Sequence, residues 1–146
     1  MTVVLSGAEI ATRLEGEFPG SIVESSQNSV AVKSEFLLAV ATFLKVTPDL
    51  YFDYLTSITA VDYYDYLEVV YQLTSIKHNH SLVVKTRCYG RDNPTVPSVV
   101  SLWRGADFQE REIYDLMGIS FDGHPNLKRL FLWQGFKGHP LRKDYL

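Results

Sequence analysis

Three runs of β-branched and aromatic residues, separated only by short segments, constrain the fold of this chain most strongly. They cover residues 54–61, 67–73 and 81–89. Such residues favour strands, and Tyr64-Asp65 marks a turn between the first two runs. The third run follows a polar turn at residues 77–80. The sequence therefore predicts a sheet of neighbouring, largely antiparallel strands.

Helical patterns flank these strands on the N-terminal side. Ser6 opens a capping-box pattern ahead of a helix predicted over about residues 7–17, and Pro19-Gly20 ends that helix. Ser34 is expected to cap a second, more apolar helix that includes residues 36–44. On the C-terminal side, a third helix is expected to begin around Val99 and Trp103. It would end at Met117, with Gly118 as its C-terminal cap.

Two short strand candidates, at residues 22–23 and 30–32, complete the predicted order α-β-β-α-β-β-β-α. This order favours an α+β fold, a two-layer sandwich with a mostly antiparallel or mixed β-sheet and helices on one face. Glycine and proline recur every few residues beyond residue 118. We therefore expect an α+β domain over 1–118 and an irregular, extended C-terminal arm over 119–146 that contacts partner subunits.

Acidic and basic side chains are distributed unevenly. The chain has a formal net charge of −3, yet residues 124–146 contain five lysines and arginines and one aspartate. The remaining residues contain nine basic and sixteen acidic side chains. A basic tail on an acidic body suggests that the tail meets a partner, and a merely solvated tail is the alternative. The acidic body argues against nucleic-acid binding, which needs a basic face.

Composition excludes several kinds of site. Cys88 is the single cysteine, which rules out an internal disulfide framework and an iron–sulfur cluster held by this chain's thiolates alone. The glycine spacing matches neither dinucleotide-binding nor phosphate-binding loops. No stretch of 18 uncharged apolar residues predicts a membrane span, and residues 1–6 lack the basic start of a signal peptide.

The densest polar cluster consists of Glu110, Arg111, Glu112 and Asp115. On a helix, Arg111 and Asp115 are four residues apart and can pair on one face. Glu110 and Glu112 project about 200° apart, so they cannot flank one substrate as a catalytic carboxylate pair does. We expect a buried or interfacial ion-pair network, with a solvated helix face as the alternative.

The histidines and the cysteine give weak signals for chemistry. His78 and His80 have no third ligand at suitable spacing, whereas zinc needs three or four, so we expect a surface turn there. His124 and His139 each lie in a Gly-His-Pro segment, which fixes the backbone but supplies no nucleophile or acid–base partner. Cys88 is expected to be a small buried residue in a strand.

Residues 110–145 carry a more specific pattern. They include Glu110-Arg111-Glu112, Asp115-Leu116, Gly118-Ile119, Gly123-His124-Pro125, Leu127, Arg129 and Gly138-His139-Pro140-Leu141-Arg142-Lys143-Asp144. In order and spacing this closely resembles the motif of the C subunit of proton-pumping NADH:quinone oxidoreductase, respiratory complex I. The segment covers about a quarter of the chain, and Pro97-Ser98-Val99 and Trp103 are also similar to the family.

The resemblance implies a non-catalytic subunit of an NADH:quinone oxidoreductase, in the peripheral arm of the complex. It would scaffold the quinone-site large subunit and the iron–sulfur subunits, with FMN and the iron–sulfur clusters in those partners and no cofactor in this chain. Electron transfer from NADH to quinone would be coupled to proton translocation. The implied location is the cytoplasmic face of the prokaryotic plasma membrane, with the membrane contacted only through the complex.

The resemblance also implies which residues form subunit interfaces. They are Glu110, Arg111, Glu112, Asp115, His124, Pro125, Arg129, His139, Pro140, Leu141, Arg142, Lys143 and Asp144.

Three alternative functions are open: a subunit of a related complex, a stand-alone enzyme and a nucleic-acid-binding protein. Equivalent subunits occur in membrane-bound nickel–iron hydrogenases, F420H2 dehydrogenases and the photosynthetic NDH complex, and the segment from Gly135 to Pro140 is most similar to the respiratory branch. A stand-alone enzyme would use His124, His139 and Glu110. A nucleic-acid binder would use the basic tail, with affinity that falls steeply as salt rises.

Overall fold

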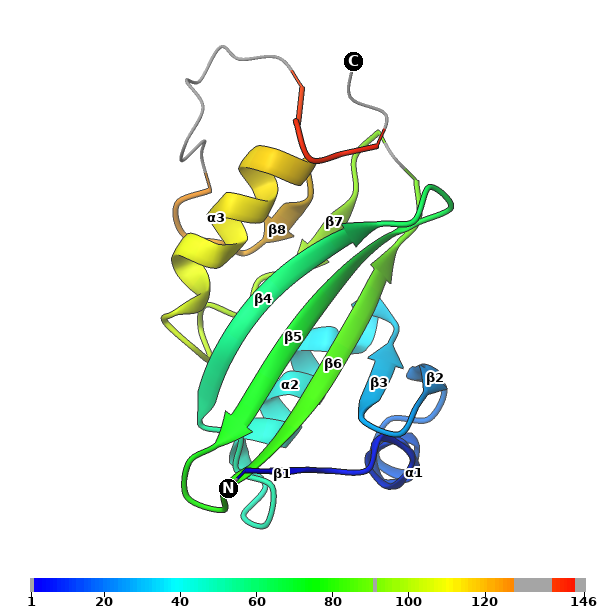
Figure 1. The fold of residues 1–146 in the computed structure, drawn as a ribbon, viewed down its shortest axis with the longest axis vertical. Helices are drawn as coiled ribbons and strands as arrows, with labels where there is room; N and C mark the ends of the chain where they lie inside the picture. The colour runs from blue at the N-terminus through cyan, green and yellow to red at the C-terminus, as the bar shows by residue number, and fades with distance from the viewer. Residues whose placement is uncertain (1, 91, 128–137, 144–146) are drawn as a thin grey trace.

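A computed structural model describes residues 2–90, 92–127 and 138–143 of the chain (Figure 1). Its centre is a six-stranded sheet in which the strand order is β2-β3-β6-β5-β4, with β1 also paired to β6. The strands are β1 Val3–Val4, β2 Ile22–Ser25, β3 Ser29–Val32, β4 Tyr54–Asp62, β5 Leu67–Ser75 and β6 His80–Cys88. Strand β1 was not predicted, because two apolar residues carry no periodicity.

Strands β4, β5 and β6 form the antiparallel meander expected from their sequence. Asp62 lies opposite Leu67 across the first turn, and Leu67 lies opposite Cys88 on the next strand. Strands β1 and β3 both run parallel to β6, so the sheet is mixed. Along β6, buried residues alternate with half-buried ones, which means that one face of the sheet is fully covered and the other only partly.

The helices cover one face of this sheet and one of its edges. They are α1 Gly7–Glu17, α2 Leu37–Val46 and α3 Ala106–Met117, with a 3₁₀ turn η1 at Ser34–Phe36. Helix α2 lies behind the sheet in Figure 1, and α3 lies beside β4. The predicted α+β two-layer fold is confirmed.

Two predicted helix starts have different outcomes. The Ser6 hydroxyl oxygen accepts a hydrogen bond from the main-chain N–H of Glu9 at 3.3 Å, which confirms the expected cap of α1. The expected cap at Ser34 is wrong, because residues 34–36 form the 3₁₀ turn and α2 begins at Leu37 without a side-chain cap.

The predicted start of the third helix near Val99 is also wrong. Residues 98–105 form successive turns, and α3 begins only at Ala106. Tertiary contacts hold these turns: the Trp103 indole N–H donates to the main-chain oxygen of Phe52 at 3.1 Å, and both residues are buried. Apolar spacing in this stretch therefore reports burial rather than helix.

Two short strands on either side of α3 were not predicted. Strands β7, Thr95–Pro97, and β8, Ser120–Asp122, pair in parallel as a separate two-stranded sheet. Ile119 and Phe121 are buried in the main core, so the folded body continues past Gly118. Three-residue strands next to proline and glycine leave no pattern in a sequence.

One apolar core joins the three helices to the main sheet and to the β7–β8 pair. It includes Leu14 from α1, Leu44 from α2, Leu82 from β6 and Met117 from α3. Cys88 is buried in the same core, as predicted, and burial raises the pKa of its thiol to about 11. In the described part of the chain, no helix combines the length and the apolar character that a membrane crossing needs.

Candidate subunit interface

Helix α3 carries four of the predicted interface residues and is fixed to the edge of the main sheet. The side-chain oxygen of Gln109 accepts a hydrogen bond from the main-chain N–H of Ile58 at 2.6 Å. Strand β4 is an edge strand of the sheet, so the Gln109 side chain satisfies a main-chain N–H that has no neighbouring strand to bind. The contact therefore fixes where α3 lies along β4.

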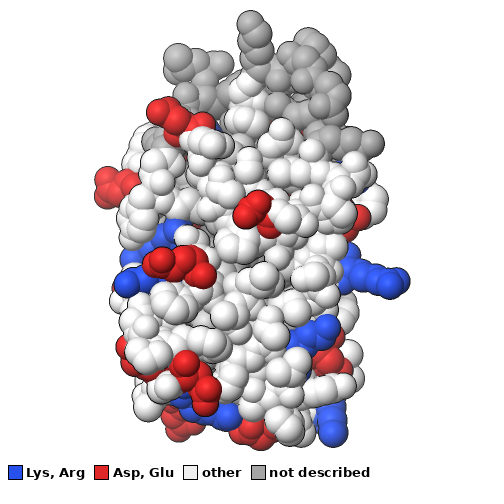
Figure 2. Space-filling view, turned by 180° about the vertical axis from the view of Figure 1, so that it is seen from behind, with Lys and Arg blue, Asp and Glu red and all other residues white. Residues whose placement is uncertain are grey.

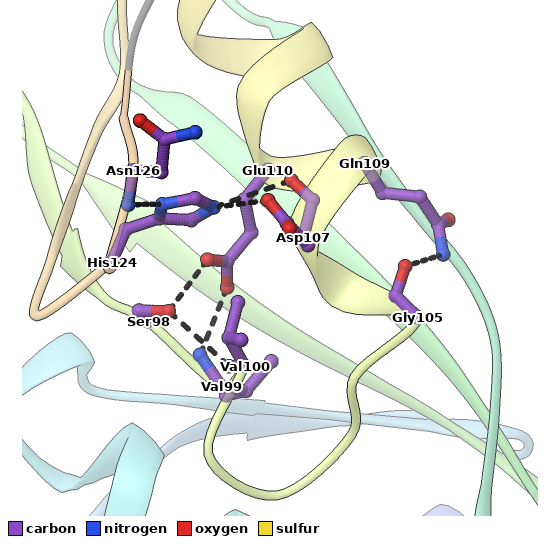
Figure 3. Close-up of polar contacts among 9 residues, drawn as sticks. All are labelled: Ser98, Val99, Val100, Gly105, Asp107, Gln109, Glu110, His124 and Asn126. Atoms are coloured by element: carbon purple, nitrogen blue, oxygen red, sulfur yellow. Dashed lines mark hydrogen bonds and ion pairs between the residues drawn. The ribbon is translucent and has the colours of Figure 1, made fainter.

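Glu110 is completely buried beneath α3. One carboxylate oxygen accepts from the Ser98 hydroxyl at 2.6 Å, and the other accepts from the main-chain N–H of Val99 at 2.9 Å (Figure 3). Burial raises the pKa of this carboxyl, although the two hydrogen bonds oppose that shift. The carboxylate thus holds the turn that precedes α3, which is a structural task.

The neighbouring charged positions face different surroundings. Glu112 is exposed, as expected from its angular separation from Glu110. The Arg111 guanidinium lies 5.4 Å from the centroid of the Phe108 ring. The predicted pairing of Arg111 with Asp115 is wrong, since no ion pair joins these two described residues; Arg111 stacks on the ring instead, and Asp115 is completely buried.

His124 packs against the first turn of α3 with its side chain fully buried. Its Nδ1 accepts from the main-chain N–H of Asn126 at 2.9 Å, so the ring proton is on Nε2. Nε2 faces Asp107, 3.3 Å from the main-chain oxygen and 3.1 Å from Oδ1 (Figure 3). The imidazole therefore clamps the loop after β8 to α3.

The C-terminal segment, residues 138–143, folds back onto the other end of α3. His139 Nδ1–H donates to the main-chain oxygen of Asp115 at 2.9 Å. The main-chain N–H of Leu141 donates to the main-chain oxygen of Leu116, also at 2.9 Å. Arg142 Nε–H donates to the main-chain oxygen of Met117 at 2.7 Å. Consecutive carbonyls of the last helical turn, which lack partners within a helix, are thus satisfied.

Gly118 makes this close approach possible. Its φ of +77° is in the left-handed region, which confirms the predicted glycine cap. A Cβ at this position would lie 2.6 Å from the His139 ring. Only glycine allows both the backbone conformation and the seating of the imidazole.

The last described residues reach the turn between β4 and β5. The main-chain N–H of Lys143 donates to Asp62 Oδ2 at 2.8 Å, and its ammonium lies 5.0 Å from the centroid of the Tyr64 ring. Asp62 Oδ1 accepts from the N–H of Tyr64 at 2.8 Å. One buried carboxylate therefore links the turn to a segment 81 residues away in sequence.

The predicted interface residues thus form two groups on α3. Glu110 and His124 lie by its N-terminal half, and His139, Leu141 and Arg142 lie at its C-terminal end. Pro125 and Leu141 are exposed, and Pro140 is half-buried. Arg129 and Asp144 lie outside the described residues. The interface role of the whole set stays a prediction, as does the division into a domain and an arm.

Residues that organise this region were missed by sequence reasoning. Ser98 and Gln109 satisfy buried or edge groups, and Asp62 receives the C-terminal segment. Ser98 was visible only within the family-like segment Pro97-Ser98-Val99. No local pattern indicates Asp62, because its partner is far away in the sequence.

The expected surface turn at His78 and His80 is only partly correct. His80 is buried, and its Nε2 lies 2.6 Å from the main-chain oxygen of Leu50. His78 Nε2 lies 2.6 Å from the main-chain oxygen of Pro48, and the two imidazoles stack 5.5 Å apart. Both rings therefore hold the loop before β4.

The described residues offer no metal cluster, and one face of the molecule shows no basic patch. No group of three or more histidine, cysteine, aspartate or glutamate side chains could hold a metal ion there. On the face opposite that of Figure 1, charged side chains of both signs are scattered over a largely uncharged surface (Figure 2). That face therefore shows no continuous basic patch of the kind that a nucleic acid would need.

Known proteins give an independent comparison. The family model for "Respiratory-chain NADH dehydrogenase, 30 Kd subunit" matches residues 30–146. The chain is 38% identical to the C subunit of NADH-quinone oxidoreductase from Roseiflexus castenholzii over 97% of this chain and 85% of that protein. It is 46% identical to the C/D subunit of NADH-quinone oxidoreductase from Phocaeicola vulgatus over 70% of this chain and 20% of that protein.

A solved structure shares the fold. It is a chain of the membrane-bound sulfane sulfur reductase (MBS), an archaeal respiratory membrane complex, and the TM-score is 0.75. The match covers 94% of this chain and 84% of the other, at 23% sequence identity. At this identity the likeness concerns the fold alone.

Proposed function

The chain belongs to the family of the 30 kDa subunit of respiratory-chain NADH dehydrogenase, and from this premise we propose that it is a non-catalytic scaffold in the peripheral arm of an NADH-quinone oxidoreductase. Its task is to position the quinone-site large subunit and the iron–sulfur subunits. Electrons then pass from NADH to quinone through groups held by those partners. Coupling to proton translocation also belongs to the whole complex.

The observation that carries this proposal is how the family-like residues are used. Glu110, His124 and His139 all bind main-chain groups of this chain. A general acid or base needs a polar atom directed at a substrate, whereas these side chains fix the course of the backbone. They shape a surface, and shaping a surface is what a scaffold subunit requires.

The surface so formed has an apolar, partly hollow centre. A cleft of about 220 Å³ lies between β4 and α3, lined by Ile58, Ala60, Ile113, Met117 and Leu141 among others. Leu141 is 60% exposed at its rim. An exposed leucine beside an apolar cleft enlarges the exposed apolar patch, and such patches mark protein–protein contacts.

The direct neighbour is proposed to be the large quinone-site subunit. The Phocaeicola vulgatus relative is named as a joint C/D subunit, and this chain covers 20% of that protein. Segments fused in one chain are kept at high effective concentration, which suits permanent neighbours. We expect FMN and the iron–sulfur clusters in partner subunits, because the single thiol here is buried in the core.

The location follows from the same proposal. We place the subunit at the cytoplasmic face of the plasma membrane, attached through its partner subunits rather than directly to lipid.

Removal of residues 140–146 tests the role of the C-terminal segment. Tagged full-length and truncated chains are expressed in cells that lack the native gene, and the complex is isolated from membranes with mild detergent. We expect the truncated chain to recover no NADH-quinone oxidoreductase activity, because Leu141, Arg142 and Lys143 lose their contacts. Full assembly and activity would contradict the proposal.

A point substitution separates assembly from folding. Leu141→Ser removes an apolar side chain that is 60% exposed, and Ile76→Ser removes one that is 67% exposed on the β5–β6 turn. Both isolated variants should melt like the parent chain. We expect only Leu141→Ser to lower the yield of assembled complex, by about tenfold, as for a central interface side chain. Equal yields would contradict the assignment.

A further inference from the structure

Four tyrosines meet at one end of the molecule. Tyr63, Tyr64 and Tyr66 lie in the turn between β4 and β5, and Tyr89 follows β6. The Tyr66 ring centroid is 5.3 Å from that of Tyr63 and 5.6 Å from that of Tyr89. Residues from two separate segments therefore form one patch, which we call the tyrosine cluster.

The cluster is exposed but held in place. Tyr63, Tyr64 and Tyr89 are 46%, 61% and 66% exposed. The Arg87 guanidinium lies 4.6 Å from the centroid of the central Tyr66 ring and is itself paired with Glu24 and Glu68. A stack of rings fixed by a paired arginine loses little conformational entropy when something docks on it.

The turn keeps a residue that its backbone disfavours. Tyr64 has a φ of +69°, in the left-handed region that glycine and asparagine occupy at lower cost. Its N–H is bound by Asp62, so the strained conformation is fixed. The turn therefore holds a 61% exposed aromatic ring at a fixed place on the surface.

The cluster is continuous with the proposed interface. The ammonium of Lys143 lies over the Tyr64 ring, and the N–H of Lys143 binds Asp62. The β4–β5 turn and residues 138–143 lie at the same end of the molecule (Figure 1). A partner that covers the C-terminal segment would therefore meet these rings as well.

We propose that the tyrosine cluster is a second docking patch for a neighbouring protein subunit of the complex, one that presents an apolar surface to the exposed rings. The proposal rests on the proposed scaffold function. Tyrosine and arginine are the residue types that dominate binding at protein contacts, and exposed aromatic rings in one patch mark such contacts.

Chemical footprinting of the intact complex tests this. Hydroxyl-radical oxidation of the isolated chain and of the detergent-purified complex is compared residue by residue. We expect oxidation of Tyr63, Tyr64 and Tyr89 to fall at least tenfold in the complex. Tyr54, 51% exposed at the far end of β4, is the matched internal reference. Unchanged oxidation of the three tyrosines in a complex that contains this chain would overturn the docking patch and leave the scaffold function intact.

Two further results would overturn the proposed docking patch in other ways. Failure of the chain to purify with respiratory subunits would overturn the scaffold function, and the docking patch with it. Protection of the tyrosines when the isolated chain is mixed with phosphatidylglycerol vesicles, but not in the complex, would assign the patch to lipid.

A variant separates docking from stability. Tyr64→Gly removes the ring and relieves the left-handed backbone, so the isolated chain should melt at the same temperature or higher. We expect it to lower the yield of assembled complex about tenfold, whereas Tyr54→Ser leaves the yield unchanged. A Tyr64→Gly chain that assembles like the parent would contradict the proposal.

Discussion

Glu110 shows how a single residue of the family-like segment is used. Its carboxylate is fully buried and bound by Ser98 and by the N–H of Val99. The sequence indicated a cluster of charges, but not which carboxylate is buried. Helical spacing separates Glu110 from Glu112 without saying which of the two faces the core, because the turn that binds Glu110 comes from outside the helix.

Glu110→Gln should change how stability depends on pH. Burial raises the folded-state pKa of Glu110 above the usual 4.5, so the folded chain holds this proton more tightly than the unfolded chain. The free energy of unfolding therefore falls as pH rises from about 4.5 through the raised pKa. Urea melts of the isolated parent and variant between pH 4 and 8 measure this. We expect the parent to lose stability relative to Glu110→Gln over that window, and parallel curves would refute the burial argument.

Cys88 should react only when the chain unfolds. Its thiol is 5% exposed, and burial raises its pKa to about 11, so about one thiol in a thousand is ionised at pH 8. Alkylation with iodoacetamide should be slow in buffer and fast in urea. Rapid alkylation of the native chain would show that β6 is not packed as described. This burial was predictable from the sequence, because a single cysteine in an apolar strand usually packs as a small hydrophobic residue.

At the scale of elements, the ends of α3 differ in how well the sequence predicts them. The C-terminal end at Gly118 follows from a local rule, since glycine in the left-handed conformation terminates helices. The N-terminal end does not, because Trp103 and Val99 are held by Phe52 and Glu110 rather than by helical neighbours. Tertiary contacts override the apolar spacing there.

Gly118→Ala and Gly123→Ala form a matched pair. Both glycines have positive φ, +77° and +87°, so alanine costs about 1–2 kcal/mol of left-handed strain at each. Only at Gly118 does the new Cβ collide with a ring, that of His139. We expect Gly118→Ala to lose more stability in thermal melts and to shift the NMR signals of His139. An equal loss with unchanged His139 signals would show that the C-terminal segment does not rest on α3.

At the scale of the whole molecule, the strand meander and the α+β class follow from residue patterns, and the family follows from residues 110–145. The folding of residues 138–143 onto α3 does not follow from any residue pattern. The contact between Lys143 and Asp62 joins segments 81 residues apart, and no spacing rule reports such a distance. Arg142 was expected to reach a partner, yet its Nε–H binds the main-chain oxygen of Met117. The surface that we propose for partner binding is thus formed by α3 and the C-terminal segment together.

The isolated chain is expected to show no NADH oxidation, since Glu110, His124 and His139 are bound to its own backbone. Spectrophotometric assay with NADH and a soluble quinone checks this. Turnover that disappears in His124→Ala would instead favour the stand-alone enzyme.

The central claim is that this chain is a scaffold within an NADH-quinone oxidoreductase, and one purification tests it most directly. The tagged chain is isolated from gently solubilised membranes, and the proteins that accompany it are identified by mass spectrometry. We expect flavin-bearing, iron–sulfur and quinone-site subunits in equal amounts with this chain, and NADH-quinone activity in the same fraction. Recovery of the chain alone, or with a nickel–iron large subunit in place of the quinone-site subunit, would contradict the account.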